Sequence, residues 1–402
     1  MIRFSIIVCL VTMFNASLFA QHGTIHGIVL DRSSHKPLEY ASVSNFRVVD
    51  SALSDGMVTG LSFAVNAQQT FTNPLLPSGA DPWCIYKNGY YYYTNTTGRN
   101  ITIWKTKDIA QLITAEKKVV FTPPVNTAYS KAVWAPEIHF LKKKWYSLKR
   151  KWYVYFAADS GNNKDHRMWV LQNSSRDPLK GSWKMKGKLH TPDDKWSIDG
   201  TVYNLKNKLY FLWSGWQGNV NGQQDIYIAG MKNPWTIKGE RVRLSSPELE
   251  WETHGDLKNK NDVAHVDVNE GPQILRNKDQ LYLIYSASGC WTDNYALGML
   301  STSFNSNILD STSWKKSLLP VFKQSPENSV YGTGHNSFFK SPDGKEDWIL
   351  YHANSQPGQG CGKFRSPRAQ KFTWNSDGSP NFGVPVKENV PLAIPATGRN
   401  ND

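Results

Sequence analysis

Five polar side chains recur along the chain, each at the start of a segment that alternates apolar and aromatic residues. They are Asp81, Glu137, Asp199, Glu270 and His335, and they are separated by 56, 62, 71 and 65 residues. Two carboxylic acids that face each other across a cavity are what glycoside hydrolysis needs, because one protonates the leaving oxygen and the other activates water or attacks the anomeric carbon. A third carboxylate nearby can raise the pKa of the acid, since like charges resist joint ionisation. Asp81, Asp199 and Glu270 could supply these three parts.

Other reaction classes lack their residue patterns in this sequence. Phosphoryl transfer would call for a glycine-rich phosphate loop, and zinc chemistry for clustered His and Cys, and neither is found. The simplest alternative for any one of the five residues is a solvated acid at a strand edge or a turn cap. Recurrence at the same place in a repeat argues against that alternative.

A hairpin pattern surrounds each of these residues: a short apolar strand, a turn rich in Lys, Asn, Gly or Asp, then an aromatic strand. Its five copies are ADPWCIYKNGYYYYTN from Ala80, APEIHF from Ala135 with RKWYVYFAAD from Arg150, IDGTVYNLKNKLYFLWSG from Ile198, NEGPQILRNKDQLYLIYSAS from Asn269, and GHNSFFKSPDGKEDWILYHAN from Gly334. Repeats of this size predict four-stranded blades with long loops, so we expect an all-β chain folded as a five-bladed β-propeller. The innermost strands of a propeller line its central channel, which would bring the five residues to one mouth. Only residues 107–118 are typical of a short amphipathic helix or turn.

Aromatic residues near the strand ends fit sugar binding, because the apolar faces of sugar rings pack on flat side chains. The alternative for each of them is ordinary packing in the propeller core. The candidates are Trp83, Trp134, Trp213, Trp216 and Trp291.

The N-terminal part of the chain predicts an exported protein whose first segment after the signal peptide is truncated or rearranged. Residues 1–20 have the basic start, apolar run and small residues of a secretory signal peptide. Residues 21–67 begin like the opening strands of a carboxypeptidase-regulatory-like β-sandwich, which then gives way to a second signal-like stretch ending at Ala67. We expect this segment to be poorly packed, and residues 68–398 to form the catalytic propeller. An apparent duplication within residues 142–156, with an insertion near Ser147, should form a longer turn.

The net charge and the cysteine content limit the classes of binding partner and the number of disulfides. The formal net charge is +13, yet the Lys residues are scattered and no nucleic-acid motif is present, so we expect no nucleic-acid partner. Attraction of acidic partners such as pectic polysaccharide is an alternative consequence of the basic exterior, while plant cell-wall polysaccharide is the expected partner. No later stretch is apolar enough for a membrane span, and we expect a monomer. Cys84, Cys290 and Cys361 follow the signal peptide and allow at most one disulfide, with burial as small hydrophobes the favoured interpretation.

These motifs together resemble family 43 glycoside hydrolases of the five-bladed propeller clan, over about Asn73 to Pro395. The resemblance implies that NPLLPSGADPW carries the general base at Asp81, WSIDGTVY a pKa-modulating and orienting carboxylate at Asp199, and NEGPQI the general acid at Glu270. It also implies that Glu137 in WAPEI is a structural or subsite group, and that Arg365 in RSPRAQKFTW contacts the sugar. His335 in GTGHNSF would approach a metal ion, usually calcium, through water.

Members of this family invert the anomeric centre, so the resemblance implies a separation of about 6.5–9.5 Å between Asp81 and Glu270, with Glu270 protonated near neutral pH. Residues 285–300 resemble α-L-arabinofuranosidase branches, which favours release of terminal arabinose from arabinan or arabinoxylan. Endo-arabinanase and β-xylosidase activities stay open within the family. A carbohydrate-binding propeller without catalysis and a non-functional fusion product are the alternatives from other classes.

Overall fold

The computed structural model describes residues 48–54, 57–63, 69–142, 149–191, 193–257 and 264–397. The chain divides into two units, Met1–Thr70 and Phe71–Asp402. In the first unit, β1 (Val48–Ser54) and β2 (Met57–Phe63) pair as an antiparallel hairpin. The predicted signal peptide and the sandwich-like residues 23–45 lie outside the described residues, as do residues 143–148, which include the predicted insertion near Ser147.

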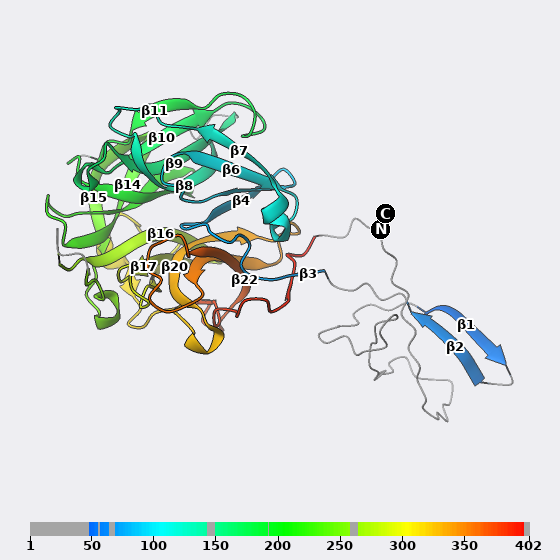
Figure 1. The fold of residues 1–402 in the computed structure, drawn as a ribbon. Coiled ribbons are helices and arrows are strands. Elements are labelled where there is room, and N and C mark those ends of the chain that lie inside the picture. The colour runs from blue at the N-terminus through cyan, green and yellow to red at the C-terminus, as the bar shows by residue number, and fades with distance from the viewer. Residues whose placement is uncertain are drawn as a thin grey trace. The chain divides into compact units, whose positions relative to one another are not determined.

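The second unit is built from strands (Figure 1). Within each sheet, paired strands that follow one another in the chain are antiparallel. The first half of this unit forms two sheets of four strands each. One comprises β4 (Trp83–Lys87), β5 (Tyr90–Thr94), β6 (Ile101–Thr106) and β7 (Glu116–Phe121). The other comprises β8 (Lys131–Lys142), β9 (Arg150–Asp159), β10 (Arg167–Asn173) and β11 (Lys184–Lys188).

The next strands form one larger sheet in which a short parallel pairing of β14 with β16 joins two antiparallel groups. Its strands are β12 (Ser197–Leu205), β13 (Lys208–Gly215), β14 (Gln223–Asn233), β15 (Thr236–Ser245), β16 (Asp267–Asn277), β17 (Gln280–Ala287), β18 (Ala296–Ser303) and β19 (Lys315–Lys316). A last four-stranded sheet holds β20 (Tyr331–Lys340), β21 (Asp347–Asn354), β22 (Ser366–Trp374) and β23 (Pro380–Asn381), and β3 (Thr70–Phe71) pairs with β24 (Leu392–Ala393).

Helical structure is confined, among the described residues, to short 3₁₀ turns: η1 (Ile109–Thr114), η2 (Asn163–Asp165), η3 (Glu250–Glu252), η4 (Ser311–Ser313) and η5 (Pro326–Asn328). The helix or turn expected over residues 107–118 is therefore correct only for its first half. Asp108 caps η1 by accepting a hydrogen bond from the Ala110 N–H, but Glu116 already opens β7, where it pairs with Lys105. No helix in the described part of the chain is long and apolar enough to cross a membrane.

Local sequence explains the hairpins. β5 is a run of four tyrosines and a threonine, residue types that favour strands. The turn before it places Asn88 and Gly89 in the left-handed region, with φ of 53° and 80°. Two consecutive left-handed residues are what a two-residue type I′ hairpin turn requires, and Asn-Gly is the favoured pair. Lys206 and Asn207 make the equivalent turn between β12 and β13, with φ of 49° and 65°.

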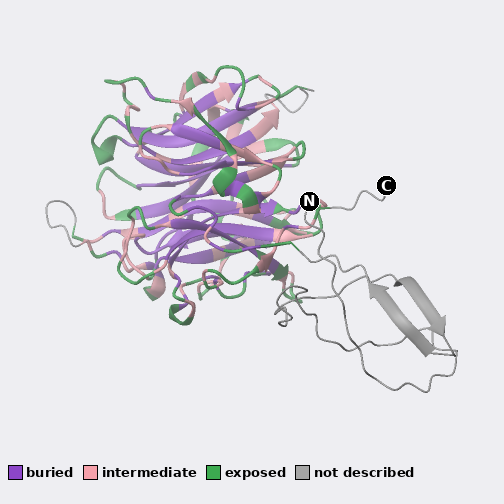
Figure 2. Ribbon diagram, turned by 45° about the vertical axis from the view of Figure 1, so that its right-hand side comes forward, coloured by how far each residue is buried: buried purple, intermediate pink, exposed green. Residues whose placement is uncertain are grey.

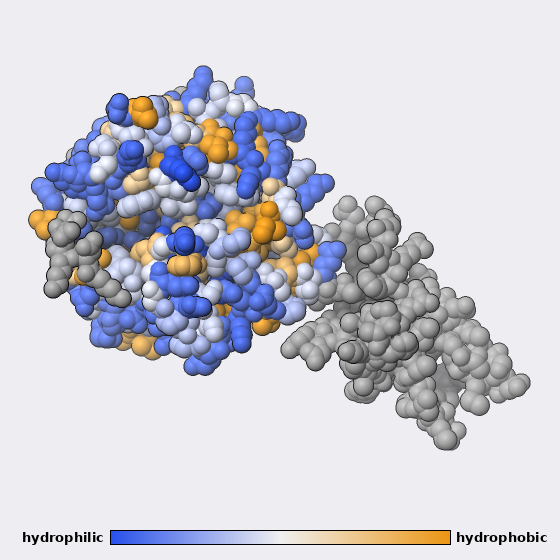
Figure 3. Space-filling model, in the orientation of Figure 1, coloured by the Kyte–Doolittle hydropathy of each residue, from blue (hydrophilic) through white to orange (hydrophobic). Residues whose placement is uncertain are grey.

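The apolar core lies between successive strand groups. One cluster joins β4–β6 to β8–β10 through residues such as Ile103 and Trp152, and further clusters continue in the same way along the chain. A fifth cluster joins the first group to the last one, with Tyr91 and Tyr93 packed near Phe339 and Leu350. Buried residues concentrate on the strands (Figure 2), while the face of this unit seen in Figure 3 is mostly hydrophilic.

Candidate active site

A left-handed residue interrupts the first strand of each later group at the same place. The φ angles are 41° at Ala135, 54° at Asp199, 57° at Gly271 and 47° at His335, and Asp81, just before β4, has 57°. In β8, β12, β16 and β20 the strand pairing shifts across this point, as in a β-bulge. Bulges re-aim side chains and are common beside active sites, so the backbone itself turns these positions away from the regular strand pattern.

This position corrects the alignment of the five polar residues made from spacing. Asp81, Asp199 and His335 do occupy equivalent places, but the equivalent of Glu137 is Ala135, and that of Glu270 is Gly271. Glu137 stands two residues further along its strand, where regular pairing resumes. The sequence carries no sign of this offset, since alanine does not favour the left-handed region.

Glu137 does not line the pocket, so of its two expected roles, a structural or a sugar-subsite group, the structural one is favoured. Its carboxylate accepts a 2.5 Å hydrogen bond from Gln273 Nε2, and it lies 2.9 Å from His139 Nε2. The side chain is buried, and burial raises the pKa of Glu137 against the opposing effect of His139. We interpret it as a structural group that links β8 to β16.

A pocket of about 450 Å³ opens above these strands. It collects the three candidate catalytic carboxylates from different elements, Asp81 before β4, Asp199 on β12 and Glu270 on β16. Of the other sequence-predicted residues it includes Trp134, Trp291, His335 and Arg365. Residues more than 280 positions apart in the chain thus meet at one cavity, as the propeller expectation required.

The surroundings of Asp81 stabilise its ionised form. Arg365 Nη1 lies 3.0 Å from Oδ1, and the Thr96 hydroxyl donates a 2.5 Å hydrogen bond to Oδ2. The same hydroxyl oxygen accepts the Ala135 N–H, which leaves its proton for Asp81. Burial alone would raise the pKa of Asp81, but Arg365 and the nearby His335 and His352 outweigh it and hold the pKa well below the usual range. A carboxylate in this state can accept a proton from water.

Glu270 and Asp199 lie in the opposite electrostatic situation. Burial raises the pKa of Glu270 to about 7, partly opposed by a 2.8 Å hydrogen bond that the Tyr295 hydroxyl donates to Oε1. Burial also raises the pKa of Asp199 well above its usual value, and the negative charge of Glu270 raises it further. The two groups therefore resist joint ionisation. A carboxylic acid with a pKa near 7 can donate a proton at neutral pH.

His335 lies between two of these carboxylates. Its Nδ1 is 3.4 Å from Asp81 Oδ1 and 3.8 Å from Asp199 Oδ2, and its backbone N–H donates to Ser286 Oγ at 2.7 Å. Burial lowers the pKa of His335, so the neutral ring is favoured. Among the residues that the structure describes, no group of three or more His, Cys, Asp or Glu side chains is arranged to hold a metal ion directly.

The tryptophans divide between pocket and core. Trp134 stacks on His166 with ring centroids 4.0 Å apart and lines the pocket, as does Trp291. Trp216 lies behind the pocket wall, stacked on Trp196 at 4.8 Å. Trp83 donates its indole N–H to Ile138 O, and Trp213 packs in the core, so neither lines the pocket. For Trp83, Trp213 and Trp216 core packing is the better interpretation.

Several residues of the site are not indicated by the sequence. Tyr295 donates a 2.8 Å hydrogen bond to the Glu270 carboxylate, and His352 Nδ1 accepts the Asp81 backbone N–H at 3.1 Å. The pocket lining also includes Trp196, Asn163, Asn221 and Gln224. Only Trp196 had a signal, since it stands three residues before Asp199 within the same motif.

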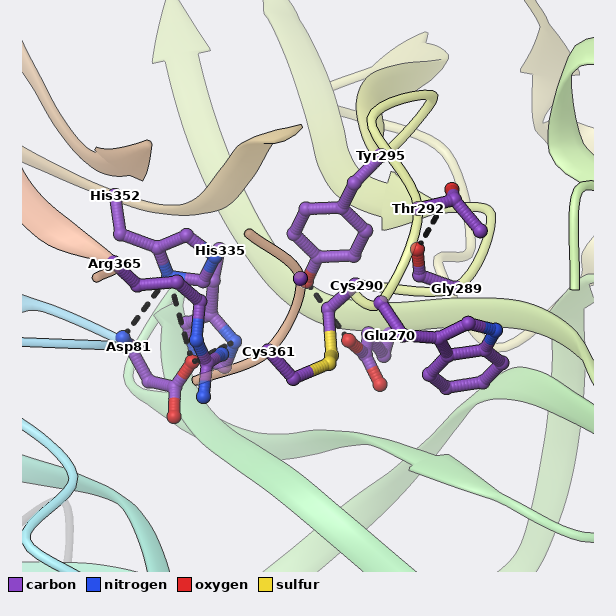
Figure 4. The surroundings of a disulfide bond; sticks show 12 residues. Asp81, Glu270, Gly289, Cys290, Thr292, Tyr295, His335, His352, Cys361 and Arg365 are labelled. Atoms are coloured by element: carbon purple, nitrogen blue, oxygen red, sulfur yellow. Dashed lines mark hydrogen bonds and ion pairs between the residues drawn. A yellow bond between two sulfur atoms is a disulfide. The ribbon is translucent and has the colours of Figure 1, made fainter. Parts of the chain in front are cut away.

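The expectation that the cysteines are buried small hydrophobes is wrong for two of the three. Cys290 and Cys361 form a disulfide with a Cα–Cα distance of 5.3 Å, and both line the pocket (Figure 4). Cys84 is free and buried, as expected. One disulfide is the maximum that the sequence allowed. Its two cysteines lie 71 positions apart, so no local pattern indicates that their side chains meet.

Known proteins resemble most of this chain. The model of glycosyl hydrolases family 43 matches residues 71–380. The chain is 39% identical over 330 residues to the extracellular exo-α-(1→5)-L-arabinofuranosidase of Streptomyces avermitilis, covering 80% of this chain and 65% of that protein. It is 34% identical to the Streptomyces chartreusis protein of the same name, covering 74% and 86%. The crystal structure of the α-L-arabinofuranosidase from Lactobacillus brevis superposes with a TM-score of 0.72 at 35% identity, covering 80% of this chain and 98% of that one.

Proposed function

The chain belongs to glycosyl hydrolases family 43, and we propose that it releases terminal α-L-arabinofuranose from arabinan or arabinoxylan side chains with inversion at the anomeric carbon. The observation that carries the proposal is a single pocket in which a buried, ionised Asp81 and a Glu270 with a pKa near 7 occur together. Its sugar specificity is supported by relatives at 34–39% identity that are named exo-α-(1→5)-L-arabinofuranosidases, which favours arabinan among the substrates.

The proposed reaction assigns each carboxylate one task. Glu270 donates its proton to the glycosidic oxygen as the bond to the leaving group breaks. Asp81 accepts a proton from the water that attacks the opposite face of the anomeric carbon. Asp199 orients Glu270 and keeps its pKa raised, since ionisation of one disfavours ionisation of the other. Arg365 holds Asp81 in its ionised form, and Trp134 and Trp291 offer apolar faces to sugar rings.

We infer a five-bladed propeller for the second unit. The inference is supported by the order of the strands, which pair in fours along the chain, and by the apolar cluster that joins the first group to the last. The parallel pairing of β14 with β16 is confined to Gln223–Asp267 and Gln224–Val268, which is consistent with two blades that touch at one point.

We also propose that calcium, where bound, is held near His335 through water molecules. Calcium prefers oxygen ligands, and one imidazole with no further cluster of protein ligands fits only a hydrated ion. Both side-chain polar atoms of Asn336 and the Nε2 atom of His352 are buried without a protein partner among the described residues, and ordered water would satisfy them. Such an ion would supply positive charge beside the carboxylates. Calcium restored after chelation should then raise the thermal unfolding temperature; an unchanged temperature would contradict this site.

Export of the protein to the periplasm or the exterior is part of the same proposal. It is supported by the extracellular relatives and by the signal-like start of the sequence. The alternative is that the chain is a non-functional fusion product. To distinguish the two, the thermal unfolding temperature and the activity of the full chain are compared with those of a variant that begins at Gln68. The proposal predicts that the variant has an unfolding temperature and an activity equal to or higher than those of the full chain.

Product analysis tests the proposed activity. The purified full chain and Glu270→Gln are incubated with linear arabinan, arabinoxylan, and aryl glycosides of arabinofuranose and xylopyranose. Free arabinose from the wild type alone is the expected result. Oligosaccharides would reassign the chain as an endo-arabinanase, xylose as a β-xylosidase, and no product from a folded chain as a carbohydrate-binding propeller.

A further inference from the structure

Two loops end at the side chains that act on the acid and the base. The acid loop, residues 288–295, joins β17 to β18 and ends at Tyr295, whose hydroxyl donates a hydrogen bond to Glu270. The base loop, residues 355–365, joins β21 to β22 and ends at Arg365, which binds Asp81. The positions of the two loops therefore influence where Tyr295 and Arg365 lie relative to the two catalytic carboxylates.

The Cys290–Cys361 disulfide is a covalent link between these loops. Cys290 lies near the start of the acid loop, and Cys361 lies four residues before Arg365 in the base loop. Figure 4 shows the sulfur atoms between the residues around Asp81 and those around Glu270, and both cysteines belong to the pocket wall.

The acid loop is well anchored to the body of the protein. The Gly289 N–H donates to His254 O at 2.8 Å, and the Trp291 indole N–H donates to Asp256 O at 2.9 Å. Gly289 has no room for a side chain, because a Cβ atom there would stand 2.2 Å from the Trp291 ring. This loop can therefore serve as a fixed support.

The base loop is held by hydrogen bonds from Asn354 Nδ2 to Gly360 O at 3.1 Å and from the Gly79 N–H to Arg365 O at 2.9 Å, but much of the chain between and beside these points is exposed. Residues 356–358 and 362–364 are exposed, and Phe364, directly before Arg365, is 48% exposed. Beyond the disulfide, the contacts to the acid loop include two 2.9 Å hydrogen bonds from the Gly358 N–H to the Asp293 carboxylate. These lie seven residues before Arg365, whereas the disulfide lies four residues before it.

We propose that the Cys290–Cys361 disulfide is a positioning element for catalysis, which fixes the base loop on the anchored acid loop and so sets Arg365 against Asp81. The proposal rests on the proposed glycosidase function of the same pocket. A displacement of about 1 Å in a catalytic arrangement can lower the rate about 100-fold. The disulfide would thus contribute to turnover beyond its contribution to stability.

The test compares the oxidised full-length chain with its phosphine-reduced form and with the variant Cys290→Ser/Cys361→Ser. Each is assayed for kcat and KM on a short α-1,5-linked arabino-oligosaccharide, for the pH dependence of kcat/KM, and for thermal unfolding. The Cys84→Ala variant is the matched control, because Cys84 is buried in a core cluster and does not line the pocket.

The expected result is a fall in kcat of about 10- to 100-fold in the reduced chain and in the double variant, with a smaller change in KM. Reoxidation should restore the reduced wild type, while the double variant should not respond to reductant. The basic limb of the pH profile should also move to higher pH, because a displaced Arg365 no longer lowers the pKa of Glu270. The other groups that act on Glu270 are Tyr295, Asp81 and Asp199.

A merely structural disulfide would lower the unfolding temperature and leave kcat, KM and the pH profile of the folded chain unchanged, and this result would overturn the proposal. If even the oxidised wild type releases no arabinose, the proposed function itself fails. An effect of the same size in Cys84→Ala would also overturn the proposal, because the loss would then not depend on the link between the loops.

Discussion

The replacement Tyr295→Phe removes a single hydroxyl group, which hydrogen bonds with Glu270 and also with the Ser286 side chain. The Tyr295 hydroxyl lies 2.8 Å from Glu270 Oε1. Burial raises the pKa of Glu270 and this hydrogen bond partly opposes it, with a resulting value of about 7. Without the bond the pKa of Glu270 rises, so the acid stays protonated to higher pH.

The size of the effect follows from the strength of the bond. A hydrogen bond to a charged group contributes about 1.5–3 kcal/mol, and a change of one pKa unit corresponds to about 1.4 kcal/mol. The basic limb of kcat/KM should therefore move upward by about 1–2 pH units. The assay is the pH profile of kcat/KM on a short arabino-oligosaccharide, because this quantity reports the pKa values of the free enzyme.

Tyr285→Phe is the matched control. Tyr285 also donates a 2.8 Å hydrogen bond to a buried carboxylate, that of Glu252, but Glu252, unlike Glu270, does not line the pocket. It should lose a comparable amount of stability and keep the wild-type pH profile. A basic limb that stays in place or moves to lower pH in Tyr295→Phe would refute the electrostatic account of Glu270.

Three further predictions test other parts of the account. Asp81→Asn should lower kcat/KM about 10²- to 10⁴-fold with an unchanged circular dichroism spectrum, because it removes the general base; near-normal turnover would exclude Asp81 from that role. Glu252→Ala should lower the free energy of unfolding by about 3–5 kcal/mol in denaturant titration, since it leaves Lys316, 2.7 Å from the Glu252 carboxylate, without its buried partner. The matched surface change Lys371→Ala breaks an ion pair of the half-exposed Lys371 with Glu346 and should cost about 0–1 kcal/mol, so equal losses would contradict the burial argument. Trp196→Ala should raise KM on oligosaccharides more than it lowers kcat, because it removes part of the pocket wall; a fall in kcat alone would contradict this placement.

The strand repeat of this chain could be predicted because its signals are local. Turn pairs such as Asn88–Gly89 and aromatic strands such as Tyr90–Thr94 specify their hairpins without help from distant residues. Asp81, Asp199 and Glu270 could be singled out because each precedes such a hairpin, and they do meet in one pocket.

The features that could not be predicted depend on contacts between distant segments or on backbone detail. Glu137 was grouped with the other carboxylates because spacing does not show that Ala135 is the left-handed residue. The partners Tyr295 and His352 act through contacts whose residues lie 25 and 271 positions apart in the chain. The disulfide depends on how two loops approach each other, which no local pattern records.

The most direct test of the central claim is the anomeric form of the first product. Proton NMR is recorded during hydrolysis of a short α-1,5-linked arabino-oligosaccharide by the wild type and by Glu270→Gln. The account predicts that β-L-arabinofuranose appears first with the wild type, before mutarotation, and that Glu270→Gln releases almost none. Initial α-L-arabinofuranose would contradict an attack by water held at Asp81, and undiminished release by Glu270→Gln would contradict the assignment of the acid.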